Sequence, residues 1–145
     1  MFGWSPVCLE ELRMSSETYI DITFDDVTIG NVPVTPVGSD LFRLEGSPLV
    51  EEAFYKDVIQ VFKDQAGSYI FEKVVEPSGR SNYCYILSQA VTDSSAFNEL
   101  TVKIERDGGY WERDFGGVFV VSLDASSELS LPKEILKLKR SIGIK

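Results

Sequence analysis

The sequence predicts an α+β fold, in which an antiparallel β-rich first part (a meander or a small barrel) is followed by an α-β-β-α part. Short runs of alternating apolar and polar residues fill the chain up to about residue 88, which is typical of strands. From about residue 94, apolar residues recur every three or four positions, which is typical of helices. The length of 145 residues predicts one domain over 1–145, β-rich over 18–88 and α-β-β-α over 94–145.

The strands of the first part are predicted from this alternation. In residues 18–24 every second residue is apolar, and Asp25-Asp26 follows as a turn. Pro33 and Pro36 each remove a hydrogen-bond donor from the next strand, so we expect that strand to be an edge or to be bent. Strands of the β-rich part are expected at residues 18–24, 27–37, 41–45, 58–62, 68–76 and 82–87.

Three helices are expected from capping residues and apolar spacing. A short one begins with Ser-Pro at residues 5–14, and a second begins with Ser at residues 94–106 and ends before two glycines. The last begins at Ser130, with Pro132 in its first turn and basic residues near its end. Strands are expected between the last two helices at residues 110–112 and 118–123.

The composition excludes several kinds of active site. The chain contains no His, so the commonest general base near neutral pH and the commonest transition-metal ligand are missing. Cys8 and Cys84 form no Cys-x-x-Cys pair and would make a poor zinc site with carboxylates, although they could form one disulfide. Cys84 lies in an apolar run and is expected to be buried. We therefore expect no catalytic residue, no metal and no cofactor.

The sequence also predicts a cellular compartment. The N-terminal residues MFGWSPVCLEELRM contain no basic region and no long apolar core, so they do not predict a secretory signal. No stretch approaches the ~20 apolar residues that a membrane span needs. We expect a cytoplasmic protein that does not bind a membrane.

The charge balance points to a class of partner. The chain has 14 Lys and Arg against 23 Asp and Glu, a net charge of −9, and its surplus of basic residues is confined to residues 132–145. Such a field repels nucleic-acid phosphates and favours a basic partner. The alternative is that the acidity serves only to keep a small protein in solution.

Two groups of residues are candidates for binding that partner. Acidic residues of the first half could form a surface that attracts a cationic protein, or they could be ordinary turn residues. They are Asp25, Asp26, Asp40, Glu51, Glu52 and Asp57. The segment 110–117 mixes the aromatic and charged residues that are enriched at interfaces with flexible glycines. Its candidates are Tyr110, Trp111, Glu112, Arg113 and Asp114; alternatively Tyr110 or Trp111 packs into the core and the loop merely turns.

Four stretches in order resemble a known family. They are residues 42–49 (FRLEGSPL), 55–59 (YKDVI), 75–79 (VEPSG) with the aromatic strand that follows, and 108–112 (GGYWE). Together they make the chain, from about residue 28 to the end, similar to a bacterial family known only as domain of unknown function 4265. The resemblance implies an α+β fold and carries no established chemistry.

These observations lead to two functional hypotheses. The first is a non-enzymatic cytoplasmic immunity protein that neutralises a cognate, basic bacterial toxin domain by occlusion; its small size and acidity are shared with proteins of that type. The alternative is a small ligand-binding or enzymatic domain in which carboxylates such as Asp57, Glu76 or Glu112 act as acid or base. The oligomeric state is left open.

Overall fold

The computed structural model describes residues 18–143, so the helix expected at residues 5–14 and Cys8 lie outside the described residues. The chain divides into two compact units, Met1–Ser78 and Gly79–Lys145. We call them the barrel unit and the sheet unit and describe each by itself. The prediction of an α+β fold with a strand-rich first part is confirmed. One domain over the whole length stays a prediction, and the internal division falls after residue 78.

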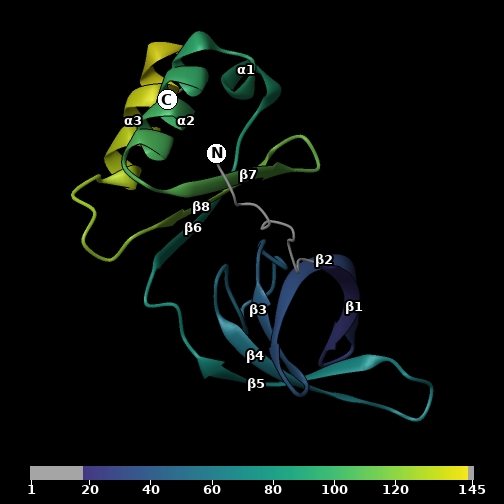
Figure 1. Cartoon of the computed structure of the whole chain (residues 1–145). Coiled ribbons are helices and arrows are strands. Elements are labelled where there is room, and N and C mark those ends of the chain that lie inside the picture. Colours follow the sequence, from purple (N-terminus) through teal and green to yellow (C-terminus); the bar gives the residue numbers. More distant parts are fainter. Residues whose placement is uncertain (1–17, 144–145) are drawn as a thin grey trace, which may run out of the picture. The chain divides into compact units, whose positions relative to one another are not determined.

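The barrel unit is a closed five-stranded barrel (Figure 1). Each strand pairs antiparallel with the next, and β1 closes the barrel by pairing parallel with β5. Of the two expected arrangements, the barrel is therefore the one present. The strands are β1 (Thr18–Phe24), β2 (Val27–Gly38), β3 (Leu41–Leu44), β4 (Val58–Lys63) and β5 (Tyr69–Glu76).

The long strand β2 connects the two sides of the barrel. Its first half pairs with β1 and its second half with β3. Because β2 pairs with β1 and with β3, it is not an edge strand, so of the two expected alternatives, an edge or a bend, the edge is wrong and the bend is left. The register shifts between Ile20 and Ile22 and between Pro36 and Gly38. Such interruptions of the ladder are places where a strand tolerates proline.

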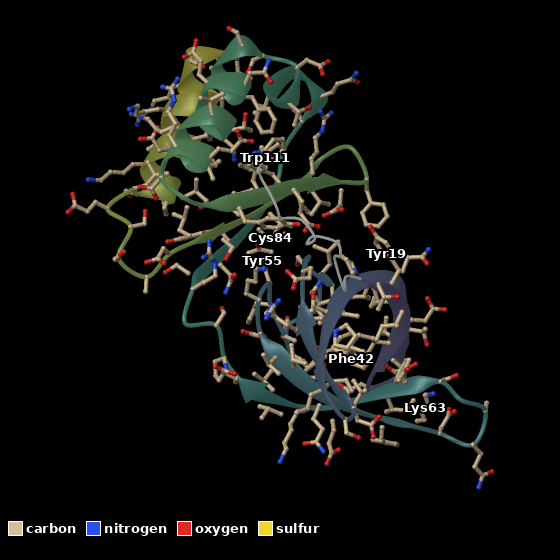
Figure 2. All side chains as sticks on the ribbon, viewed as in Figure 1. Tyr19, Phe42, Tyr55, Lys63, Cys84 and Trp111 are labelled. Atoms are coloured by element: carbon tan, nitrogen blue, oxygen red, sulfur yellow. The ribbon has the colours of Figure 1, made fainter. Side chains whose placement is uncertain are left out.

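The apolar side chains that alternate along the strands fill the barrel. Ile22 and Phe24 of β1 and Phe42 and Leu44 of β3 are buried, as the alternation predicts. Phe42 lies inside the barrel in Figure 2 and contacts Tyr69 edge to face at 5.4 Å between ring centroids. The buried cluster consists of Ile22, Phe24, Val32, Val34, Phe42, Leu44, Ala53, Ile59 and Val61.

A buried carboxylate holds the connection between β3 and β4. Asp57 is only 5% exposed, and its Oδ2 accepts a hydrogen bond from the backbone N–H of Phe54 at 2.9 Å. Its Oδ1 accepts another from the N–H of Ser78 at 2.8 Å. Both hydrogen bonds are part-buried, and a charged acceptor makes each of them stronger than a neutral one would. Asp57 is therefore not part of an exposed acidic surface, and that part of the sequence prediction is wrong.

The sheet unit is a three-stranded antiparallel sheet with helices (Figure 1). The strand order is β6-β8-β7. The sequence predicts β6 as part of the β-rich region 18–88, but in the structure it belongs to the sheet unit. Its partner β8 lies more than 30 residues further along the chain, a pairing that local alternation does not reveal. The elements are β6 (Ser81–Ile86), α1 (Gln89–Thr92), α2 (Ser95–Arg106), β7 (Tyr110–Asp114), β8 (Val118–Leu123) and α3 (Leu131–Ser141).

Helices α2 and α3 pack on one face of this sheet. The side chain of Ser94 caps α2 by accepting a hydrogen bond from the N–H of Phe97, and Pro132 lies in the first turn of α3. Both helices were expected, and the one-turn helix α1 was not. The core between helices and sheet contains Leu87, Val91, Phe97, Leu100, Ile104, Phe119, Val121, Leu123, Leu131, Ile135 and Leu138.

The register of the sheet determines on which of its faces Cys84 lies. Cys84 pairs with Val120, and neither side chain belongs to the core under the helices. Its neighbours Tyr83 and Tyr85 point the other way and pack against that core. Cys84 is consequently exposed, and the prediction that it is buried is wrong.

None of the helices in residues 18–143 is long and apolar enough to cross a membrane.

Replacing the buried carboxylate tests its part in the barrel unit. Asp57→Asn should lower the free energy of unfolding by about 1–3 kcal/mol, because the amide nitrogen cannot accept one of the two backbone hydrogen bonds. Urea denaturation followed by circular dichroism measures this loss. Glu72→Gln, at an exposed position of β5, is the control and should not change the midpoint. An Asp57→Asn protein as stable as the wild type would show that these bonds contribute nothing.

Candidate partner-binding site

Five of the six acidic candidates of the barrel unit lie exposed in its connections. Asp25 and Asp26 form the β1–β2 turn, Asp40 lies in the β2–β3 turn, and Glu51 and Glu52 lie in the β3–β4 connection. Among residues 18–143, none of the five forms an ion pair with a lysine or arginine. Their charges are therefore available to a partner.

The charge of the chain is divided unequally between the units. Residues 1–78 contain five basic and fourteen acidic side chains, whereas residues 79–145 contain nine of each. The net charge of −9 thus resides entirely in the barrel unit, and the sheet unit is neutral. A field of this kind attracts basic molecules and raises their rate of association.

Internal contacts occupy most of the basic groups of the barrel. Glu45 accepts hydrogen bonds from Arg43 at 2.9 Å and from Lys56 at 2.5 Å, and Lys63 lies over the ring of Tyr69. Burial raises the pKa of Glu45, but the bonds from Lys56, Thr35 and Arg43 outweigh burial and hold that pKa below its ordinary value. Glu45 therefore neutralises nearby cations, while the turn carboxylates remain free of them.

The second group of candidates divides between the two faces of the sheet. Successive side chains of a strand point to opposite faces. Tyr110, Glu112 and Asp114 lie on the face without helices, opposite Ser122, Val120 and Val118 of β8. Trp111 and Arg113 lie on the face that carries the helices. The structure therefore brings three of the five together and separates them from the other two.

Trp111 is half-buried and packs against the core of the sheet unit. It packs against Phe97 and Phe119, with ring centroids 6.2 and 6.0 Å away, and its indole N–H donates to Glu105 at 2.8 Å. Figure 2 shows it on the helix side of the sheet. Of the two alternatives left by the sequence, the structure favours packing for Trp111, whose ring lies half-buried against the core.

A carboxyl pair lies on the opposite face. The hydroxyl of Tyr110 donates to Glu112 at 2.5 Å, and Glu112 in turn interacts with Asp114. Burial, together with the hydrogen bond and the negative charge of Glu112, raises the pKa of Asp114 from 3.8 to about 7. Two adjacent carboxylates cannot both ionise easily, so this pair retains a proton near neutral pH.

Arg113 fixes the β7–β8 hairpin. Its Nε donates to the carbonyl of Gly116 at 2.6 Å, and its Nη2 donates to the hydroxyl of Thr92 in α1 at 3.1 Å. The N–H of Leu87 also donates to the carbonyl of Gly117 at 2.8 Å. The guanidinium is engaged within the sheet unit, and its role there is to position the hairpin.

The residue at the tip of this hairpin, Phe115, is not among the candidates expected from the sequence. Phe115 is 90% exposed and has a φ of 53°, and Ile86, on the adjoining strand, is 83% exposed. The sequence contains one signal for this exposed residue, namely a bulky apolar side chain directly before two glycines in a predicted turn. A left-handed conformation at such a residue costs roughly 1 kcal/mol.

Three surface cavities of about 290 to 440 Å³ lie on residues 18–143. One is lined by Asp107, Asp124 and neighbouring polar groups, one lies between α2 and α3, and one lies beside the β1–β2 hairpin. None of the three is lined by Glu112 or Asp114. The carboxyl pair therefore does not face any of these cavities.

Comparison with known proteins adds evidence about the fold. No family model matches this chain, and no curated protein matches it. The resemblance to domain of unknown function 4265 therefore stays a prediction. A crystal structure of a hypothetical protein from Neisseria gonorrhoeae is similar over 90% of this chain and 91% of its own, with a TM-score of 0.61 and 13% identity. At this identity the likeness shows a shared fold and says nothing about activity.

The raised pKa of Asp114 predicts how pH affects stability. Its protonated form is favoured in the folded protein, so this stabilising effect is complete below pH 3.8 and is lost as the pH rises to about 7. Asp114→Asn, which mimics the protonated acid, should raise the Tm at pH 8 and have little effect at pH 4.5. Thermal unfolding at both pH values measures the difference. Glu99→Gln, at an exposed site of α2, is the control; an equal effect of Asp114→Asn at both pH values would contradict the prediction.

Proposed function

We propose that this protein is a non-enzymatic bacterial immunity protein, which acts in the cytoplasm and neutralises a cognate toxin domain by covering its active surface. The observation that carries the proposal is the charge distribution. The barrel unit has a net charge of −9, and five acidic residues of its connections are exposed without a basic partner among residues 18–143. We propose in addition that the chain belongs to the family it resembles, domain of unknown function 4265.

The mechanism follows from the range of the forces involved. Acidic groups that are not neutralised attract a basic protein over about a Debye length, roughly 8–10 Å, and orient it before contact. The same field repels nucleic acids, so this protein does not bind them itself. It competes with a negatively charged substrate of the toxin because both are attracted to the same basic surface. Once bound, the inhibitor excludes the substrate sterically and needs no chemistry of its own.

Co-expression is the first test of this proposal. The gene immediately upstream in the native genome is expressed with and without this protein, and the tagged protein is then purified. We expect the C-terminal domain of the neighbour to co-purify at a 1:1 ratio and its toxicity to disappear. A monomer that does not bind the neighbour at micromolar concentration would overturn the proposal.

The acidic turns predict an effect on association kinetics. Glu51→Gln/Glu52→Gln and Asp25→Asn/Asp26→Asn should each lower the association rate constant several-fold at low salt, by about one order of magnitude when combined. This difference should shrink at about 0.5 M salt, because screening removes the field. Stopped-flow or biosensor measurements at several salt concentrations test it.

A charge-matched control separates the effect of the acidic turns from the effect of the total charge on the association rate. Glu99→Gln/Glu128→Gln removes the same charge from exposed positions of the sheet unit. It should change the association rate much less than Glu51→Gln/Glu52→Gln does. Equal effects of the two double variants would show that the turns have no special role.

The carboxyl pair favours a second candidate, a domain that binds a small ligand or uses carboxylates for catalysis. A carboxyl group with a pKa of about 7 is suited to proton transfer at neutral pH. Under this alternative, Glu112→Gln and Asp114→Asn abolish turnover or ligand binding. Under the immunity proposal, both variants still protect against the toxin.

A further inference from the structure

The aromatic side chain of Phe115 is almost fully exposed, so its burial contributes very little to folding. It lies in the turn between β7 and β8, and 90% of its surface is exposed. A second apolar residue of the sheet unit, Ile86, is 83% exposed. Ile86 pairs with Val118, the first residue after this turn, so both exposed side chains lie at the same end of the sheet.

The backbone at this position is unfavourable for phenylalanine. Phe115 and Gly116 have consecutive positive φ values of 53° and 81°. Hairpin turns of that kind favour Asn, Asp or Gly, because bulky side chains are strained in the left-handed region. Since Phe115 contributes little burial and is strained, folding by itself does not account for a phenylalanine here.

The turn is nevertheless held firmly. Arg113 donates to the carbonyl of Gly116 and to Thr92, and the N–H of Leu87 donates to the carbonyl of Gly117. A Cβ atom on Gly117 would lie 2.7 Å from the carbonyl oxygen of Leu87, so the approach of the two strands is close. A residue presented on a fixed turn loses little conformational entropy when it binds a partner.

We propose that Phe115, together with Ile86 at the same end of the sheet, is the apolar anchor by which this protein holds the toxin domain, and that it inserts into an apolar pocket of that domain. This inference rests on the proposed function. The net charge of −9 lies in the barrel unit and attracts a cationic protein, whereas Phe115 belongs to the neutral sheet unit. The pocket that receives Phe115 therefore belongs to a basic partner but needs no basic surroundings of its own. Aromatic residues are enriched at the centres of interfaces, where one or two anchors carry most of the affinity.

The test is the substitution Phe115→Asn, which removes the anchor and suits the turn better. The Tm should rise by about 2–5 °C, because the strain is relieved. The affinity for the toxin domain of the upstream gene should fall by about 30-fold or more, chiefly through faster dissociation. Phe115→Tyr keeps the ring and should retain most of the affinity. Leu136→Asn, at a large apolar residue of α3 that is 49% exposed, is the control and should bind as the wild type does.

The outcomes separate this inference from the function on which it rests. If wild-type protein does not bind the toxin domain, the proposed function is overturned and the anchor with it. If wild type and Phe115→Asn bind equally well, only the anchor is overturned and the immunity function stands. A fall in the Tm of Phe115→Asn would show that the fold requires Phe115, and would also overturn the anchor. Weaker binding with an unchanged or higher Tm supports it.

Discussion

The position of β8 in the middle of the three-stranded sheet determines what the sheet unit can present to a partner. β8 pairs with β6 on one side and β7 on the other, so the register assigns every side chain of the three strands to one of two faces. Phe119, Val121 and Leu123 face the helices and are buried. The same register places Trp111 against this core, where it is half-buried, and leaves Glu112 and Asp114 together on the face without helices.

Under the proposed function, the two units would contribute differently to recognition of the toxin domain. In the barrel unit, closure encloses the apolar residues and leaves five acidic residues of the connections exposed to water, which moderates their mutual repulsion. In the neutral sheet unit, hydrogen bonds from Arg113 and Leu87 stabilise one turn. Long-range charge governs how fast a partner arrives, and a rigid apolar contact governs how long it stays.

Buried polar groups connect local sequence to long-range structure in both units. Asp57 joins two connections through backbone N–H groups that lie far apart in the sequence, at Phe54 and Ser78. Asp114 owes its raised pKa to burial and to Glu112, two residues away on the same face of β7. A carboxylate in a sequence is equally compatible with an exposed charge, a structural acceptor and a proton-sharing pair, because burial decides among them.

The candidate site could be predicted in part. The turn positions of Asp25, Asp26 and Asp40 follow from local patterns and are exposed as expected. The burial of Asp57 and the packing of Trp111 against the core do not follow from such patterns, and neither does the exposure of Phe115. Each of these depends on which segment packs against the residue.

The sequence by itself determined the α+β class, most strands and the two long helices, because alternation, helical spacing and capping act between near neighbours. It also determined the acidic charge and the absence of histidine. Only the tertiary structure decided the closure of the barrel through β1 and β5 and the transfer of β6 to the second sheet. These features rest on hydrogen bonds between strands distant in the chain, and a strand's own sequence does not specify its partner.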